Sequence, residues 1–111
     1  MKRAALIALG WLAGGCGNDA GPAMPIDPAV LYGQMCARCH GPDGRGDAQL
    51  KATTMPTLRS FADPEVRARS STDEFERVIM AGRNLMPAFG GQISMPKIQA
   101  ISGYAKRLGG R

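Results

Sequence analysis

One short stretch of the chain, "QMCARCHGPDG" (residues 34–44), combines two thiols and an imidazole. Cys36 and Cys39 are separated by two residues, and His40, the only histidine of the chain, follows directly. Side chains of these types at this spacing can bind zinc, form a redox disulfide or attach a haem covalently. The rest of the chain discriminates among these three types of chemistry.

Two of the three types of chemistry need further ligands or a secondary structure that the sequence does not provide. A structural zinc site usually has four Cys or His ligands, and the only further candidate is Cys16, which lies in an apparent export signal. A thioredoxin-like disulfide follows a strand, but no alternating β-branched run predicts one. Haem attachment uses all three side chains, because the two thiols form thioether bonds and His40 binds the iron.

A second iron ligand would have to come from another part of the chain. Because there is one histidine, a second imidazole ligand is excluded within the chain, and the methionines remain. Met86 is the favoured candidate, since "GRNLMPAFGG" lies between glycines and Pro87 disfavours helix at the residue before it. Met55 and Met95 are the alternatives if Met86 does not bind the iron.

Capping signals and apolar periodicity predict three helices and a short fourth that position these residues. The helices are expected at 28–36, 71–81 and 94–108, with the short one after Pro64. Residues 41–60, rich in Gly, Pro, Asp and Thr, are expected to form a loop. The expected buried positions are, in chain order, Val30, Leu31, Tyr32, Met35, Phe75, Val78, Ile79, Ile98, Ile101, Ala105 and Leu108. The fold class is therefore mainly α, with three to four helices and long loops wrapped around one covalently bound haem.

The first 27 residues are expected to direct export of the protein and to tether it, and not to be part of the folded domain. Residues 1–16 have a positive start, a short apolar run and small residues before Cys16, as in a lipoprotein export signal. Cys16 is therefore the expected lipid attachment site. Ala13 stands where such signals usually have a large aliphatic residue, so cleavage by an ordinary signal peptidase is the alternative. Residues 17–27 are expected to be a flexible tether, and 28–111 the folded domain.

Three segments, in the right order, resemble the landmarks of class I (mitochondrial-type) c-type cytochromes of the bacterial monohaem group. "LYGQMCARCHGPDGRGD", with Tyr32 four residues before the first cysteine, is similar to the haem-attachment segment of the family. "IMAGRNLMPAFGG" is similar to its methionine loop and "IQAISGYAKRL" to its closing helix. The resemblance covers about residues 28–108 and implies the cytochrome c fold.

The resemblance also implies roles for single residues. It implies that His40 and Met86 are the two axial ligands and that the carbonyl of Pro56 accepts a hydrogen bond from Nδ1 of His40, with Pro42 as the weaker candidate for this acceptor. The family usually has a glycine eight residues before the first cysteine, where this chain has Pro28. Close contact between the first and last helices is therefore expected to depend on Ala29 and Gly103.

The function implied is single-electron transfer outside the cytoplasm, not catalysis, because two axial ligands leave no open position on the iron. The alternatives are a haem subunit of a periplasmic dehydrogenase or oxidase, and a gas-binding or peroxidatic protein if the methionine ligand is labile. With 14 Lys and Arg against 9 Asp and Glu, the net charge is +5, but the basic residues are dispersed and aromatics are few. We therefore expect redox partners with acidic docking surfaces, no nucleic acid, a monomer, and a periplasmic or membrane-anchored location.

Overall fold

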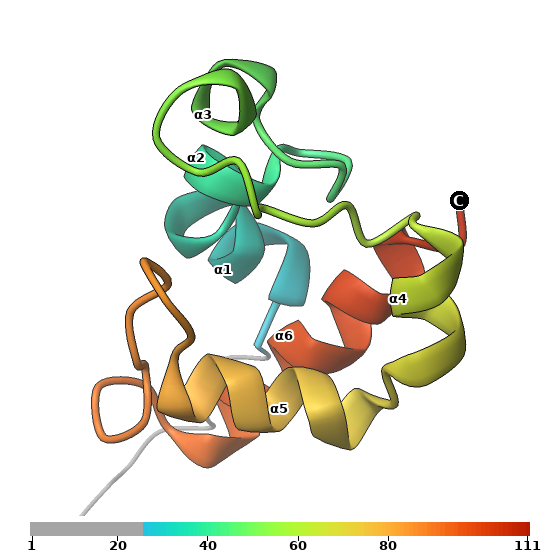
Figure 1. The fold of residues 1–111 in the computed structure, drawn as a ribbon. Coiled ribbons are helices and arrows are strands. Elements are labelled where there is room, and N and C mark those ends of the chain that lie inside the picture. The colour runs from blue at the N-terminus through green and yellow to red at the C-terminus, as the bar shows by residue number, and fades with distance from the viewer. Residues whose placement is uncertain (1–25) are drawn as a thin grey trace, which may run out of the picture.

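The computed structural model describes residues 26–111, which form six α-helices and no β-strand (Figure 1). In chain order the helices are α1 (Pro28–Met35), α2 (Ala37–His40), α3 (Ala48–Ala52), α4 (Pro64–Arg69), α5 (Thr72–Ala81) and α6 (Met95–Leu108). The mainly α fold class is thereby confirmed. The expected export signal, Cys16 and nearly all of the expected tether lie outside the described residues. Between residues 26 and 111, no helix combines the length and the apolar composition needed to cross a bilayer.

Helices α1 and α5 begin where their capping residues predicted. The carboxylate of Asp27 accepts a hydrogen bond from the backbone N–H of Ala29 at 2.9 Å, and α1 starts one residue after Asp27. The Ser71 hydroxyl accepts one from the backbone N–H of Glu74 at 3.1 Å, at the start of α5. Side-chain acceptors at these positions satisfy N–H groups that have no partner inside the helix.

Two short helices account for the difference from the expected number. One of them, α2, follows α1 after a break at Cys36, whose N–H still donates to the carbonyl of Tyr32 at 2.9 Å. The other, α3, lies within the segment expected to be a loop. It forms because the Asp47 carboxylate accepts a hydrogen bond from the backbone N–H of Leu50 at 2.9 Å. A single capped turn is too short to show an apolar periodicity, which is why the composition of this segment indicated a loop.

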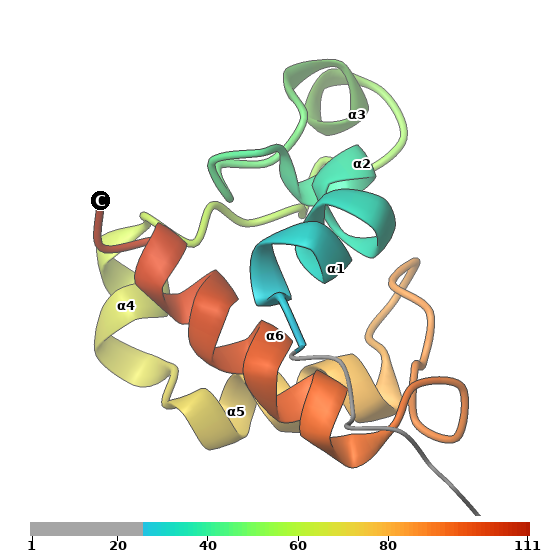
Figure 2. The same cartoon turned by 180° about the vertical axis from the view of Figure 1, so that it is seen from behind.

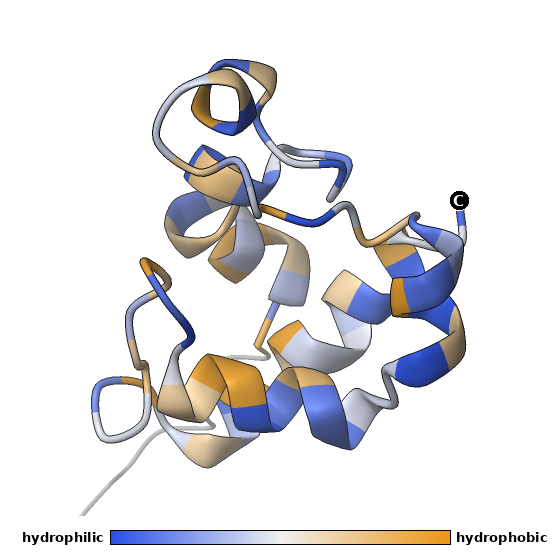
Figure 3. Cartoon of the chain, viewed as in Figure 1, coloured by the Kyte–Doolittle hydropathy of each residue, from blue (hydrophilic) through white to orange (hydrophobic). Residues whose placement is uncertain are grey.

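The core is built around α6, which packs against both α1 and α5 (Figure 2). Ile98 and Ile101 form one buried cluster with Ile79 of α5. Ala105 and Leu108 form another with Tyr32 of α1. All four residues expected on the inner face of α6 are therefore buried. The C-terminal half of α5 is hydrophobic and lies beside the loop that carries Met86 (Figure 3).

The contact between α1 and α6 differs from the expected close approach at Gly103. A Cβ added at Gly103 would meet only the side chain of Arg107 in the same helix, so no neighbouring backbone requires a glycine there. Ala29 is exposed and does not serve the contact either. Tyr32 fills the interface instead, with its ring centroid 5.3 Å from that of Tyr104. Val30, two residues away on the opposite side of α1, is consequently 52% exposed rather than buried.

Candidate haem site

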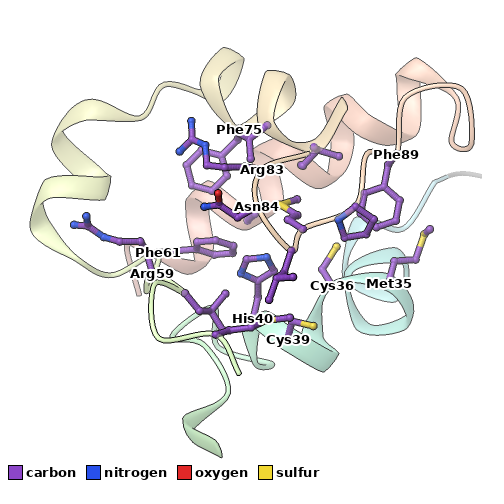
Figure 4. A pocket seen from close by; sticks show the side chains of 18 of the residues that line it. Met35, Cys36, Cys39, His40, Arg59, Phe61, Phe75, Arg83, Asn84 and Phe89 are labelled. Carbon is purple, nitrogen blue, oxygen red and sulfur yellow. The ribbon is translucent and has the colours of Figure 1, made fainter. Parts of the chain in front are cut away.

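A cavity of about 510 Å³ opens between α1–α2, α5 and the loops that follow α3 and α5 (Figure 4). Cofactor and small-molecule sites usually have volumes of about 300–1,000 Å³ and mostly apolar walls. This wall contains several large apolar side chains, among them Phe61, Phe75, Phe89, Ile79 and Ile101. The side chains that the sequence singled out for haem all line the same cavity, namely Cys36, Cys39, His40 and Met86.

The two cysteines reach the cavity from the junction of α1 and α2. Cys36 lies at the break between the helices and Cys39 lies within α2, and both thiols are free. Burial raises the pKa of Cys36 to about 11, and the neighbouring Cys39 adds to the shift. Neither cysteine forms a disulfide, so both sulfur atoms are available for thioether bonds to one group in the cavity.

His40 ends α2 with its imidazole at the cavity wall, stacked on Phe61 with the ring centroids 4.9 Å apart and the planes 28° from parallel. Burial lowers the pKa of His40, which favours the neutral ring that binds metal ions. Its Nδ1 is buried and has no hydrogen-bond partner among residues 26–111. A buried imidazole with an unpaired nitrogen, beside two free thiols in a cofactor-sized cavity, fits a covalently attached haem.

The hydrogen bond expected between His40 and Pro56 is not formed in this structure. Pro56 is exposed, although its neighbours Met55 and Thr57 line the cavity. The reason is a turn, closed by a hydrogen bond from the N–H of Leu58 to the carbonyl of Met55 at 3.0 Å. Pro56 occupies the second position of this turn, which proline favours because its φ is fixed. The turn places Pro56 at the surface instead of against the imidazole.

Tyr32 supports the segment of His40 from the core. Its side chain is only 2% exposed, and its hydroxyl donates a hydrogen bond to the carbonyl of Gly41 at 2.6 Å. Burial raises the pKa of Tyr32 far above its ordinary value, so the phenol keeps its proton and remains a donor. Since Gly41 directly follows His40, this bond fixes the end of α2 that presents the imidazole.

Met86 is held at the cavity by the loop between α5 and α6. Its N–H donates to the carbonyl of Arg83 at 2.9 Å, and the N–H of Arg83 donates back to the Met86 carbonyl at 3.2 Å. The N–H of Phe89 donates to the carbonyl of Ile79 at 2.9 Å, which ties the loop to the end of α5. The side chains of Met86 and Phe89 pack against the isoleucine cluster of α5 and α6.

The alternative methionine ligands differ in their positions. Met55 lines the cavity, as Met86 does. Met95, at the start of α6, is 39% exposed and is not among the residues that form the cavity wall. Two of the three candidate methionines, Met86 and Met55, are therefore within the site.

Sequence reasoning missed two parts of the wall. One is Phe61, whose ring packs on His40. The other is Glu74 of α5, whose carboxylate lies 3.5 Å from the guanidinium of Arg83 in the methionine loop. This exposed ion pair contributes at most about 1 kcal/mol. The first contact joins distant segments, and the second joins α5 to the loop that follows it. Neither has a helical spacing that a local pattern could have indicated.

Replacing Gly82 with alanine is expected to disturb the methionine loop. Gly82 has a φ of +71°, and a Cβ there would lie 2.7 Å from the carbonyl oxygen of Met86 and 2.9 Å from the N of Ala88. With a ψ of 169°, Gly82 has a conformation that is essentially restricted to glycine and costs about 1–3 kcal/mol for another residue, and displacing the loop backbone adds to it. We expect the free energy of unfolding of the haem-loaded protein to fall by about 3 kcal/mol, measured by denaturant titration.

Gly91→Ala is the matched control for Gly82→Ala. Gly91 lies in the same loop with a φ of +80°, but a Cβ there would meet nothing within 4 Å. The free energy of unfolding of this variant should therefore fall only by the conformational cost, about 1–2 kcal/mol. Equal losses in the two variants would show that the contact of Gly82 with the backbone at Met86 is unimportant.

Comparison with known proteins assigns this arrangement to a family. Residues 23–104 match the family described as "Cytochrome C oxidase, cbb3-type, subunit III". A cytochrome c6 of a Synechococcus species is 30% identical over 78 residues, which cover 70% of this chain and 64% of that protein. A cytochrome c-555 of Methylococcus capsulatus is 33% identical over 81 residues, which cover 66% of this chain and 58% of that protein.

The fold also matches a solved structure. The KustC0563 c-type cytochrome superimposes with a TM-score of 0.66 at 27% identity, over 75% of this chain and 98% of that one. The chain thus spans nearly the whole of this structural neighbour, but less than two thirds of the length of the two relatives compared by sequence.

Proposed function

Since the chain belongs to the class I c-type cytochromes and so carries covalently bound haem c with its iron, we propose that it transfers single electrons between redox partners. In this proposal Cys36 and Cys39 would attach the haem, and His40 and Met86 would bind its iron. The observation that carries the proposal is that Met86, far away in sequence, lines the same cavity of cofactor size as the adjoining Cys36, Cys39 and His40.

The iron of a bound haem supplies one-electron redox chemistry, and the residues of the chain set its conditions. His40 offers a neutral imidazole whose segment is held by the bond from Tyr32 to Gly41. The thioether of Met86 is a soft ligand, which favours ferrous iron and raises the reduction potential relative to two imidazoles. The apolar wall adds to this, because it disfavours the extra positive charge of the ferric form.

The mouth of the cavity offers a place for a partner to approach. Met35 and Leu85 both line the cavity and are 37% and 62% exposed. Exposed apolar side chains that surround a site are typical of surfaces that contact other proteins. We propose redox proteins with acidic docking surfaces as the partners, in keeping with the net charge of +3 that 12 basic and 9 acidic residues leave once Lys2 and Arg3 of the signal are removed. We also propose that the carrier is a monomer and that it does not bind nucleic acid.

The proposed location is outside the cytoplasm, in the periplasm or anchored to a membrane that faces it. Support comes from the sequence of residues 1–16, which has the features of an export signal ending at Cys16. A lipid on Cys16 would keep the domain near a membrane at the end of the tether formed by residues 17–27. Such an anchor favours electron transfer over short distances.

A second candidate function is that of a haem subunit within a periplasmic oxidase or dehydrogenase. The specific observation in its favour is the matching family, whose description names a subunit of a cbb3-type oxidase. The chemistry of the cavity would be the same in both cases. The two candidates differ only in whether the chain binds its partner permanently, as a subunit, or transiently, as a free carrier. Co-purification of the chain with a membrane oxidoreductase would favour this second candidate over a free carrier.

The proposed function is tested by redox titration of the haem-loaded protein together with exposure of its reduced form to carbon monoxide. We expect one reversible one-electron transition and no rapid uptake of carbon monoxide, because the side chains of His40 and Met86 would both bind the iron and leave no position for the gas. Rapid uptake of carbon monoxide by the untreated protein would instead support a gas-binding or peroxidatic function.

A further inference from the structure

We propose that the end of the molecule formed by α4 and the last turn of α6 is a second docking surface, which binds an acidic protein. We call it the basic end, and its basic residues are Arg67, Arg69, Lys106, Arg107 and Arg111. The proposal rests on the proposed electron-carrier function and gives it a second partner site, apart from the mouth of the haem cavity. In both views α4 lies beside the C-terminal end of α6 (Figures 1 and 2).

The basic end contains a depression of its own, with a volume of about 430 Å³. Arg67 of α4 and Lys106 of α6 line it, and Phe61 and Phe75 form an aromatic part of its wall. A carboxylate that enters this depression would meet a guanidinium and an ammonium group, both on exposed residues. The chemistry of the depression therefore suits an acidic side chain.

The charges of the basic end are free to act on a partner. Within residues 26–111, none of its five basic side chains lies within 4 Å of a carboxylate oxygen in an ion pair. Glu65, in the first turn of α4, is instead 3.2 Å from Arg59. At the haem cavity, by contrast, Arg59 is also paired with Asp63 at 2.9 Å, and Arg83 is paired with Glu74 at 3.5 Å. Unpaired charges steer an oppositely charged partner more strongly than paired ones.

The basic end is connected to the haem site by two aromatic rings. Phe61 and Phe75 line both the haem cavity and the depression, with their centroids 5.3 Å apart. Phe61 also stacks on His40, and Figure 4 shows it on the side of His40 that faces away from Cys36 and Met35. A partner at the basic end would therefore be separated from the proposed iron ligand by one aromatic layer. Such a short separation suits electron transfer.

Phe61 is also held rigidly in this position. Its N–H donates to the carbonyl of Gly44 at 2.8 Å. Its carbonyl packs directly against Gly109, which leaves no room for a side chain at that position. The aromatic layer between the two sites is therefore a fixed part of the fold, and α6 ends where it contacts that layer.

The surface favours a protein partner over a lipid surface. Peripheral membrane binding usually combines basic residues with exposed large apolar side chains that enter the bilayer. The large hydrophobic residues that are exposed within residues 26–111 all lie elsewhere: Ile26, Val30, Met35, Met80, Leu85 and Met95. The basic end thus offers charge and a shallow aromatic depression, which fit an acidic protein surface.

The first test uses a redox-inert paramagnetic trianion, hexacyanochromate(III), as the probe of the acidic partner. Added to the reduced haem-loaded protein at low ionic strength, it should broaden the backbone amide signals of residues 64–70 and 106–111. The charge-reversal variant Arg67→Glu/Lys106→Glu should lose this broadening. The control variant Lys51→Glu/Lys97→Glu, with the same change in net charge, should keep it. Broadening confined to residues at the haem cavity, or lost equally in both variants, would overturn the proposal.

The second test measures the rate at which hexacyanoferrate(III) oxidises the reduced protein. One electron passes from each ferrous protein to one hexacyanoferrate(III), which yields ferric protein and hexacyanoferrate(II). Arg67→Glu/Lys106→Glu should slow this reaction roughly tenfold relative to Lys51→Glu/Lys97→Glu at low ionic strength, and high salt should remove the difference. Equal rates in the two variants would overturn the second surface alone, whereas a wild type that is not oxidised would overturn the electron-carrier function.

A third measurement separates the protein partner from a lipid surface. The haem-loaded protein without its N-terminal signal should not sediment with vesicles of anionic phospholipid at physiological ionic strength. Sedimentation that depends on Arg67 and Lys106 would assign the basic end to a membrane and contradict the proposal.

Discussion

The Met86→Ala protein is expected to lose the weak near-infrared band of a sulfur–iron bond and to have a lower reduction potential than the wild type. The thioether stabilises ferrous iron, so its removal favours the ferric form. The fall should be on the order of 0.1 V, a part of the roughly 0.8 V over which axial ligands set haem potentials. Redox titration and the absorption spectrum of the ferric protein measure the two effects.

Two further substitutions serve as controls for Met86→Ala. Met55 also lines the cavity, so Met55→Ala tests the competing ligand directly. Met95 is exposed and lies outside the cavity wall, so Met95→Ala should leave both the band and the potential unchanged. A near-infrared band that survives in Met86→Ala and disappears in Met55→Ala would transfer the ligand role to Met55.

The Cys36→Ser/Cys39→Ser protein is expected to contain no covalently bound haem and to lose its native fold. Without the haem, the cavity of about 510 Å³ would have to remain empty, fill with water or collapse. At about 24 cal/mol per Å³ of unfilled cavity, the cost is on the order of 10 kcal/mol. This is an upper bound because the mouth is open to solvent, yet it is comparable with the whole stability of a typical domain, about 5–15 kcal/mol.

Two measurements check the cysteine prediction. The mass of the purified chain should lack one haem, and circular dichroism should show reduced helix content and no cooperative thermal transition. Cys16→Ser is the control, since Cys16 belongs to the expected export signal and should not affect haem attachment. Covalent haem in the double variant, or its loss in Cys16→Ser, would contradict the assignment of Cys36 and Cys39.

The elements that the sequence predicted are those with strong local signals. Asp27 and Ser71 cap the helices they were expected to cap, because a side-chain acceptor at a helix start acts within three residues. The inner face of α6 was also predicted, since four apolar residues repeat at helical spacing over three turns. Haem c was predicted from three residues within a stretch of five whose chemistry is specific, and the family assignment confirms this cofactor.

The features that the sequence did not predict depend on packing between distant segments. Gly103 was expected at a close helix contact, but Tyr32 fills that interface and leaves Gly103 without a close backbone neighbour. Pro56 was expected to reach His40, but its turn directs it to the surface. The stacking of Phe61 on the imidazole requires Gly44 and Gly109 to hold the Phe61 backbone, and no periodicity records such a contact.

The central claim is that His40 and Met86 together bind the iron of an electron-carrying haem. The near-infrared absorption spectra of the ferric wild-type and Met86→Ala proteins test it most directly, because the weak band arises from a sulfur–iron bond and Met55 also lines the cavity. We predict that the band is present in the folded, haem-loaded wild-type protein at neutral pH and absent from Met86→Ala. A folded, haem-loaded ferric wild-type protein without this band, or a band that survives in Met86→Ala, would contradict the claim.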